Sequence, residues 1–331
     1  MPIITGRENV LAIYEKAAKK GWVIPCFCSE NLTTTEAILT AASDFAKEKG
    51  YDGIPVTLAI TNRYDRRTQS AYYTHTRRWD IGLELFRSNL EILSRVFPDL
   101  DVMIHLDHAQ HDADEELLES DLSMYSSVMY DASVLPMEEN MEKTRAYVRR
   151  KGQELLIEGA CDEITDADGE IRCEITDADK CERYMRETGV DIVVANLGTE
   201  HRASGHDLHY RCDAARAIKA RIGSRICLHG TSSVSNNQIK KLFDDGICKV
   251  NIWTALERDS SPALTEWTVK NAAKCGGPAL EHKLIEQGYL TECSGTGNKS
   301  TLDYYTTTAR QEIIFREMKK IVRGYLDLWY C

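Results

Sequence analysis

The sequence lacks any long hydrophobic run, which argues against a membrane-spanning helix. None of its apolar stretches approaches the roughly 18 residues that such a helix needs. Residues 1–22 also lack the apolar core of a secretory signal peptide. Their apolar side chains recur at helical spacing instead, from Val10 to Ala17, and predict an amphipathic helix. We therefore expect a cytoplasmic protein with no membrane partner.

The sequence also lacks a basic excess and any repeated cysteine spacing. Its 52 acidic and 41 basic residues give a net charge of −11. Because nucleic-acid binding needs a basic surface, this balance argues against nucleic acid as a partner. Cys26 and Cys28 are too close together for half of a zinc ribbon, and no second pair follows them. The 11 cysteines are therefore expected to be mainly buried thiols.

No segment rich in proline, glycine or serine divides the chain, so we expect one domain over residues 1–331. Eight short runs rich in Val, Ile, Leu and Ala have the composition of strands buried on both faces. They occupy residues 22–28, 54–61, 101–108, 126–132, 154–160, 191–198, 225–230 and 248–253. Helices are expected at about residues 33–48, 79–95, 111–121, 138–150, 177–188, 212–221, 235–244 and 254–271. This alternation predicts an α/β protein, and the count of eight favours a closed (β/α)8 TIM barrel over an open doubly wound sheet.

The barrel is expected at about residues 8–272, with a C-terminal helical extension at about residues 273–331. The extension begins with an irregular Gly-rich segment and ends in a long amphipathic helix. This helix could close the bottom of the barrel or pack on a neighbouring subunit. Two helix starts carry capping signals, because Thr33 with Glu36 fits a capping box and Thr176 precedes the helix at 177–188.

Polar side chains stand at the C-terminal ends of the predicted strands, where the active sites of TIM barrels lie. These strand ends carry Asp107, His108, Asp131, His201, His229 and Asn251. Three imidazoles with an open fourth position are typical of a catalytic zinc site. We therefore predict that His108, His201 and His229 bind a metal ion.

Other histidines near these positions are interpreted differently. His105 lies one pleat deeper than Asp107 on the same strand and is expected to be a packed core residue. His111 is expected to face solvent. His206 and His209 are expected on a loop surface rather than as spare ligands.

Five motifs carry a resemblance to a known family. HLDH (105–108), SSVMYD (126–131), VVANLGTEH (193–201), LHGTSS (228–233) and KVNIWT (249–254) occur in this order. They resemble the motifs HLDHG, SVMID, AIGTxHG, LHGGSG and KVNIDT of the class II, zinc-dependent fructose-bisphosphate aldolases, a group that includes tagatose-bisphosphate aldolases. The resemblance runs from about residue 9 to 260 and is weaker in the extension.

The resemblance implies a role for each strand-end residue. His108, His201 and His229 would bind one catalytic Zn²⁺, which would stabilise the enediolate of a dihydroxyacetone (phosphate)-like donor. Asp107 would be the acid/base at the C4 oxygen, with the alternative that it orients a ligand histidine. The resemblance does not decide whether a second divalent or a monovalent cation also binds. It also leaves open whether the catalytic metal is zinc or another ion.

The resemblance also implies residues around the substrate and the metal. Substrate contacts would come from Asn251, Gly230, Ser232 and Thr61, and Asp131 and Glu158 would support the ligands or form an alternate metal position. The family uses a carboxylate on the loop after strand five to move the C3 proton. That loop holds the first of two EITDAD copies, at 163–168 and 174–179. Glu163 is the preferred acid, Asp162 and Asp166 are the alternatives, and a merely solvated loop is the competing interpretation.

The departures from the family motifs gather at the substrate end. Arg202 replaces a glycine and would offer a forked cation to an anionic substrate, or else form a surface salt bridge. Thr231 and Ser233 replace glycines of the phosphate cradle, and Trp253 replaces an aspartate. Cys28, Thr61 and Ala160 replace the family's Asn, Ser and Glu. The metal ligands and the base of the family motifs are therefore retained. Which ketose is cleaved, which aldehyde is the acceptor, and whether the substrate must carry phosphate all stay open.

The predicted function is a class II aldolase, a lyase of carbohydrate metabolism such as glycolysis, acting on a ketose (bis)phosphate or related ketose. A sugar (phosphate) epimerase or isomerase is the main alternative, although it would need a second base that the sequence does not show. A zinc hydrolase and a non-catalytic partner subunit are also considered, but the retained ligands and base argue against the latter. The resemblance suggests a homodimer or homotetramer.

Overall fold

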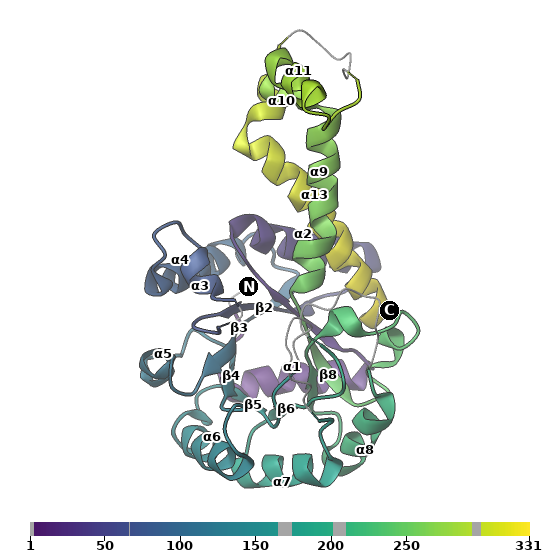
Figure 1. The fold of residues 1–331 in the computed structure, drawn as a ribbon. Coiled ribbons are helices and arrows are strands. Elements are labelled where there is room, and N and C mark those ends of the chain that lie inside the picture. The colour runs from purple at the N-terminus through teal and green to yellow at the C-terminus, as the bar shows by residue number, and fades with distance from the viewer. Residues whose placement is uncertain (1–2, 66, 165–173, 201–209, 293–298) are drawn as a thin grey trace.

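Eight parallel strands close into a barrel in chain order, with the last strand paired to the first. This computed structural model describes residues 3–331 except 66, 165–173, 201–209 and 293–298. The strands are β1 (Ile24–Cys28), β2 (Ile54–Thr61), β3 (Leu100–Gln110), β4 (Ser127–Asp131), β5 (Leu156–Ala160), β6 (Ile192–Val194), β7 (Ile226–Leu228) and β8 (Ile247–Ile252). The barrel confirms the predicted TIM-barrel fold (Figure 1).

Helices surround the barrel and continue beyond it. They are α1 (Arg7–Lys19), α2 (Leu32–Lys49), α3 (Gln69–Tyr72), α4 (Trp79–Leu93), α5 (Glu115–Glu119), α6 (Met137–Lys151), α7 (Ala178–Thr188), α8 (Cys212–Ile222), α9 (Thr254–Lys270), α10 (Ala272–Gly276), α11 (Pro278–Glu286), α12 (Leu302–Tyr305) and α13 (Thr307–Trp329). Among the described residues, no helix combines the length and apolar character needed to cross a membrane.

Three local expectations were wrong. The helix predicted at 235–244 is only the short 3-10 helix η2 (Ile239–Lys241), because its Ser-Asn-Asn start favours turns over helix. The helix α2 is capped by Asn31, which accepts a hydrogen bond from the Thr34 amide at 3.2 Å, so Thr33 lies inside the first turn. Asp177, rather than Thr176, caps α7. Both capping predictions failed because several neighbouring polar residues can cap a helix, and the sequence alone did not identify the right one.

The N-terminal helix α1 covers the bottom of the barrel. The sequence alone also allowed the C-terminal helix at this position. The amide of Ile4 donates to Val102 near the start of β3, and that of Arg7 donates to Glu154 just before β5. The Arg7 side chain also pairs with Asp191 at 2.7 Å, just before β6. The buried face of α1, with Val10, Ile13 and Ala17, matches the predicted amphipathic helix.

The chain after β8 forms an arm, which α9 begins, and then returns to the barrel. Figure 1 shows α9, α10, α11 and the start of α13 extending away from the barrel, and the end of α13 lying beside α2. The returning end is anchored by Trp329, whose indole donates to the Ile239 carbonyl at 2.9 Å, and by the fully buried Tyr330. The extension therefore packs on the barrel side. That residues 1–331 form a single domain stays a prediction.

Replacing Tyr330 with alanine is expected to lower the free energy of unfolding by about 3 kcal/mol. The ring of Tyr330 lies 4.5 Å from that of Trp22, and its hydroxyl donates to the Pro55 carbonyl at 2.6 Å. Urea unfolding of the full chain measures the loss. Tyr305→Ala is the matched control, because Tyr305 is 45% exposed. Equal losses in both variants would contradict the anchoring role.

Candidate active site

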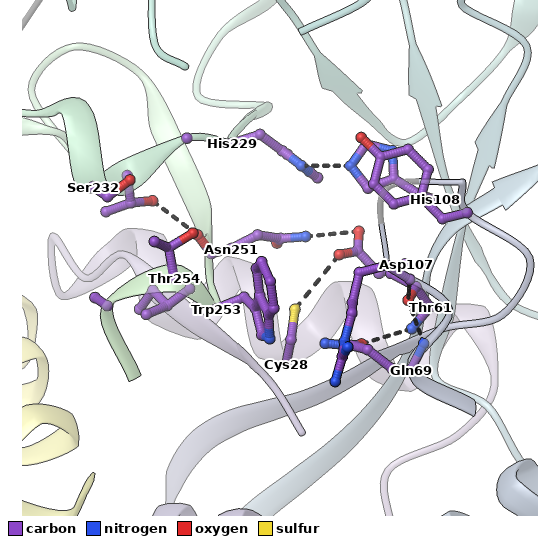
Figure 2. A pocket seen from close by; sticks show the side chains of 16 residues that line it. Cys28, Thr61, Gln69, Asp107, His108, His229, Ser232, Asn251, Trp253 and Thr254 are labelled. Atoms are coloured by element: carbon purple, nitrogen blue, oxygen red, sulfur yellow. Dashed lines mark hydrogen bonds between the residues drawn. The ribbon is translucent and has the colours of Figure 1, made fainter. Parts of the chain in front are cut away.

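A pocket opens at the C-terminal ends of the strands, where the sequence places its candidate residues (Figure 2). It is lined by Cys28, Thr61, Tyr64, Arg67, Gln69, Asp107, His108, His229, Gly230, Thr231, Ser232, Asn251, Ile252, Trp253, Thr254 and Ala255. Residues from β1, β2, β3 and β8, and from the turn after β7, thus converge on one mouth. His201 and Arg202 lie outside the described residues, so their roles stay predictions.

Two of the predicted metal ligands meet in this pocket. His108 Nε2 lies 3.1 Å from His229 Nδ1, and both side chains are buried. Asp131 lies 2.7 Å from Nδ1 of His108, so the opposite nitrogen of that ring is directed to the pocket. A carboxylate behind an imidazole is the usual support for a metal-binding histidine. Ligand atoms of Asp107, His108 and His229 all lie within 4.8 Å of one another, a donor set that fits a divalent metal ion.

The local backbone explains how adjacent residues Asp107 and His108 both reach the pocket. Successive side chains of a regular strand point to opposite faces. His108 adopts a left-handed φ of 45°, and the register between β3 and β4 shifts between Leu106 and Ala109. This bulge turns His108 to the same side as Asp107. A left-handed histidine is strained, and such strain persists where the surrounding structure holds a functional side chain in place.

Both carboxylates beside His108 are held in the ionised form. Burial opposes ionisation of Asp107, but the nearby His108, His105 and His229 outweigh it and keep the pKa of Asp107 well below its ordinary value. For Asp131, burial is likewise outweighed by the hydrogen bond and charge of His108, so its pKa is also lowered. These pKa directions suit a metal-binding centre, where anionic groups offset a cation.

The carboxylate of Asp107 is held in its orientation by two side chains from other strands. Asn251 Nδ2 donates to one carboxylate oxygen at 2.9 Å, and Cys28 Sγ donates to the other at 3.5 Å. Figure 2 shows this carboxylate between the two histidines and Cys28. Asp107 therefore stands where a proton could pass to a substrate atom next to the metal-binding histidines.

A buried ion pair that the sequence analysis missed lies beneath the site. Lys249 Nζ lies 2.7 Å from Glu158, and both side chains are fully buried. His105 Nε2 lies 3.7 Å from Glu158 and 3.8 Å from Asp107, so His105 is the core residue that was predicted. The lysine within the apolar run CKVNIW was the signal that could have revealed this pair. Glu158 also groups with Cys227 and His229 as possible ligands, but the Lys249 ammonium already compensates its charge.

Tyr64, also missed, stacks on the ring of His108. The two ring centres are 4.2 Å apart and the planes differ by 5°. Tyr64 and His108 both line a second pocket, together with Asp131 and Glu163. The predicted loop acid Glu163 and the predicted ligand His108 therefore border one pocket. Nothing in the local sequence pattern marked the loop after β2 as part of the site.

Two of the predicted loop acids, Asp162 and Glu163, line this second pocket. The carboxylate of Asp162 accepts a hydrogen bond from Thr176 at 2.7 Å and forms an ion pair with Lys180. Asp162 is therefore engaged by α7 and its preceding turn. Asp166 lies outside the described residues.

The turn after β7 is built for close approach. A Cβ on Gly230 would lie 2.8 Å from backbone atoms of Glu200, and Gly230 has a left-handed φ of 67°. The hydroxyl of Ser233 accepts from the Glu200 amide at 3.0 Å, and that of Thr231 donates to the Asn251 carbonyl at 2.8 Å. The hydroxyls that replace family glycines are therefore used to tie the turn to its neighbours.

The N-terminus of α9 also lines the pocket, through Thr254 and Ala255. Its N-cap residue, Trp253, makes no side-chain capping hydrogen bond. The first amides of a helix carry no partner within it and attract anions. Together with Gly230 and Ser232, this end of the pocket could hold a phosphate. At the opposite end the hydroxyl of Thr61 donates to the Arg67 carbonyl, and is thereby engaged in the protein.

Trp253 and Glu30 form a further contact that the sequence analysis missed. The indole nitrogen of Trp253 donates to Glu30 at 2.8 Å, and Arg67 and Gln69 donate to the same carboxylate. Nearby Glu257, in the first turn of α9, has an Oε1 with no hydrogen-bond partner among the described residues. Burial, and then the charge of Glu30, raise the pKa of Glu257 to about 7.

Replacing Glu257 with glutamine is expected to stabilise the protein at pH 8 but not at pH 5. A raised pKa in the folded state means that stability is lost as the pH rises through about 7. At 1.36 kcal/mol for each pKa unit, the increase in the free energy of unfolding at pH 8 cannot exceed about 3 kcal/mol, and we expect about 1–2 kcal/mol. Urea unfolding at both pH values measures it. Glu286→Gln, an exposed substitution on α11, is the control. An equal gain at both pH values would contradict this explanation.

The chain is similar to proteins of one family. The family model "Fructose-bisphosphate aldolase class-II" matches residues 8–323. The fructose-bisphosphate aldolase of Staphylococcus epidermidis is 28% identical over 313 residues, which cover 91% of this chain and 100% of that relative. The Staphylococcus aureus protein of the same name is 27% identical with the same coverage. A crystal structure of fructose-bisphosphate aldolase from Campylobacter jejuni has a TM-score of 0.76 at 18% identity, covering 99% of this chain and 97% of that one. That structural likeness shows a shared fold.

Proposed function

Because the chain belongs to the class II fructose-bisphosphate aldolase family, and is thus a lyase, we propose that it reversibly cleaves a ketose phosphate by the aldol reaction. The family is the one that the motifs predicted. The products would be a dihydroxyacetone phosphate-like donor and an aldehyde. The meeting of His108 and His229 at 3.1 Å, beside the Asp107 carboxylate, is the observation that carries the proposal.

The two described histidines fit a zinc site, and we propose His201 as the third ligand. When bound, zinc would act as a Lewis acid that stabilises negative charge on the donor oxygens. Asp131 would hold His108 in the tautomer that leaves Nε2 for the metal, as their 2.7 Å contact supports. Imidazole ligands suit zinc and other borderline metals, so metal analysis of the purified protein is needed to name the ion.

The proton transfers are proposed for two carboxylates. Asp107 would take the proton from the C4 hydroxyl as the carbon–carbon bond breaks, and return it in the condensation. Its contacts with Asn251 and Cys28 support a fixed orientation. Glu163 would move the C3 proton, a role supported by its place in the lining of a pocket that His108 also lines.

The donor phosphate is proposed to lie at the N-terminus of α9, beside Gly230 and Ser232. Arg202 would add a cation and Asn251 would contact the donor carbons. We further propose a cytoplasmic homodimer or homotetramer acting in carbohydrate metabolism, in keeping with the family resemblance. An epimerase would need a second base opposite Asp107, and among the described residues that line its pocket Asp107 is the only carboxylate.

Proton exchange on the donor tests this function without knowledge of the acceptor. The purified protein is mixed with dihydroxyacetone phosphate, and separately with dihydroxyacetone, in D₂O, and loss of the C–H signal is followed by NMR. We expect exchange on the phosphate, abolished by a chelator and restored by Zn²⁺. Exchange that survives the chelator would contradict the metal-dependent mechanism, and no exchange with zinc present would contradict the donor assignment.

A further inference from the structure

The donor phosphate is proposed to bind beside Ser232 and Thr254. The opposite end of the pocket has an unusual composition. Figure 2 shows Ser232 and Thr254 on one side of the pocket, Thr61 and Gln69 on the other, and Trp253 between them. The donor is proposed to occupy the first side. Because Asp107 would act at C4, the carbons beyond C4 must extend toward Thr61 and Gln69. We call the four residues Trp253, Glu30, Arg67 and Gln69 the acceptor wall.

Trp253, Arg67 and Gln69 each donate a hydrogen bond to one carboxylate, that of Glu30. Glu30 is 8% exposed and accepts from the Trp253 indole at 2.8 Å, from Gln69 Nε2 at 3.2 Å and from Arg67 Nε at 3.1 Å. A second guanidinium nitrogen of Arg67 pairs with the other oxygen of Glu30. A phosphate site needs donors that are directed to the ligand. Here these donors are already directed to the protein's own carboxylate.

The charges of this region also disfavour a second phosphate. The cation of Arg67 is cancelled by Glu30, with which it forms a two-point ion pair. Glu257 stands close enough to both to interact with their charges. A phosphate dianion beside Arg67 would therefore approach two carboxylates and a cation that is already paired.

Trp253 supplies an apolar surface instead. Its indole packs on the small cluster of Cys26, Cys28 and Ala59 at the tops of β1 and β2. With one edge fixed by Glu30 and the ring packed on this cluster, the indole is a rigid wall of the pocket. Aromatic walls of this kind bind the carbon backbone of a neutral ligand, while a few polar groups orient it.

We propose that the acceptor wall selects an uncharged acceptor aldehyde, so that the ketose cleaved carries phosphate on its donor carbon alone. This inference rests on the proposed aldolase function. Glu30 is a positioning residue: it holds Trp253 and neutralises Arg67, the cation that lines the pocket among the described residues, so that Arg67 does not recognise a phosphorylated acceptor.

Acceptor competition tests the proposal with the zinc-loaded full chain. Condensation of dihydroxyacetone phosphate is measured with D-glyceraldehyde and with D-glyceraldehyde 3-phosphate, each corrected for its free aldehyde fraction. We expect kcat/KM to favour the unphosphorylated aldehyde at least about tenfold. Glu30→Gln keeps the shape and an oxygen acceptor for Trp253 but frees the charge of Arg67. It should move the ratio about tenfold toward the phosphorylated aldehyde. A purely structural role would lower both rates in proportion and leave the ratio unchanged.

Two more variants secure the interpretation. Glu257→Gln removes the other nearby acid, and should move the ratio about threefold in the same direction even if Glu30→Gln folds poorly. Glu84→Gln, an exposed substitution on α4, should leave the ratio as it is. A wild-type preference for the phosphorylated aldehyde would overturn the proposal, and so would a ratio that neither Glu30→Gln nor Glu257→Gln moves.

Donor exchange in D₂O separates this proposal from the function on which it rests. Exchange without condensation of either aldehyde would overturn the acceptor proposal and leave the donor chemistry standing. Absence of exchange would reject the aldolase function and the acceptor proposal with it. Exchange together with preferred condensation of glyceraldehyde would support both.

Discussion

Replacing His108 with alanine is expected to remove the bound metal and the activity together. His108 offers Nε2 to the pocket 3.1 Å from His229, and its other nitrogen is held by Asp131. Without this imidazole, the described donor set keeps one histidine and the Asp107 carboxylate. We expect zinc content after dialysis to fall to near zero, and cleavage to fall by at least about a thousandfold. Metal analysis and a coupled cleavage assay measure the two effects.

His282→Ala is the matched control for this experiment, because His282 is exposed on α11 in the arm. It should leave both the zinc content and the cleavage rate at wild-type values. If His108→Ala retained stoichiometric zinc, the metal site proposed here would be wrong. Loss of zinc with unchanged cleavage would instead show that the metal takes no part in the reaction.

Replacing Asp107 with alanine is expected to keep the metal and abolish cleavage. A positioned acid/base contributes about 10²- to 10⁴-fold, so we expect kcat to fall about a thousandfold. Because Asp107 is proposed to act at the C4 oxygen, exchange of the donor C3 proton should persist while the carbon–carbon bond stays intact. Asp112→Ala, at an exposed position shortly after Asp107, is the control.

This experiment also decides between two roles that the geometry allows. The Asp107 carboxylate lies within 4.8 Å of ligand atoms of both His108 and His229, so it could be a metal ligand. Loss of zinc from Asp107→Ala would identify it as a ligand and contradict the proposed base. Retained zinc with wild-type cleavage would show that neither role is needed.

Much of this arrangement was predictable because repetition along the chain is local information. Apolar runs separated by amphipathic segments predicted eight strands, and β2 was placed at its observed bounds, Ile54–Thr61. The ends of parallel strands meet at one mouth, so strand-end position alone grouped Asp107, His108, His229 and Asn251, which the pocket brings together. Errors of a few residues in the strand bounds did not matter, because each of these four residues still lies close to the C-terminal end of its strand.

Other elements depended on competition between neighbouring residues or on partners far away in the chain. Asn31 rather than Thr33 caps α2, since both can cap and only the three-dimensional start of the helix chooses. The stacking of Tyr64 on His108, and the contact of Trp253 with Glu30, join segments separated by tens to hundreds of residues. No local pattern contains such information.

The sequence by itself determined the barrel, the family and the identities of the candidate metal ligands and base. Periodicity and strand-end position are properties of the chain alone, and they fix where each side chain emerges. Only the tertiary structure decided how the pocket is finished. The left-handed turn at His108 lies at a register shift between β3 and β4, and the Lys249–Glu158 pair joins β8 to β5. The acceptor wall joins the segments that follow β1, β2 and β8. Buried charges must find partners wherever the fold brings them, and here that requirement shapes the end of the pocket that we propose selects the substrate.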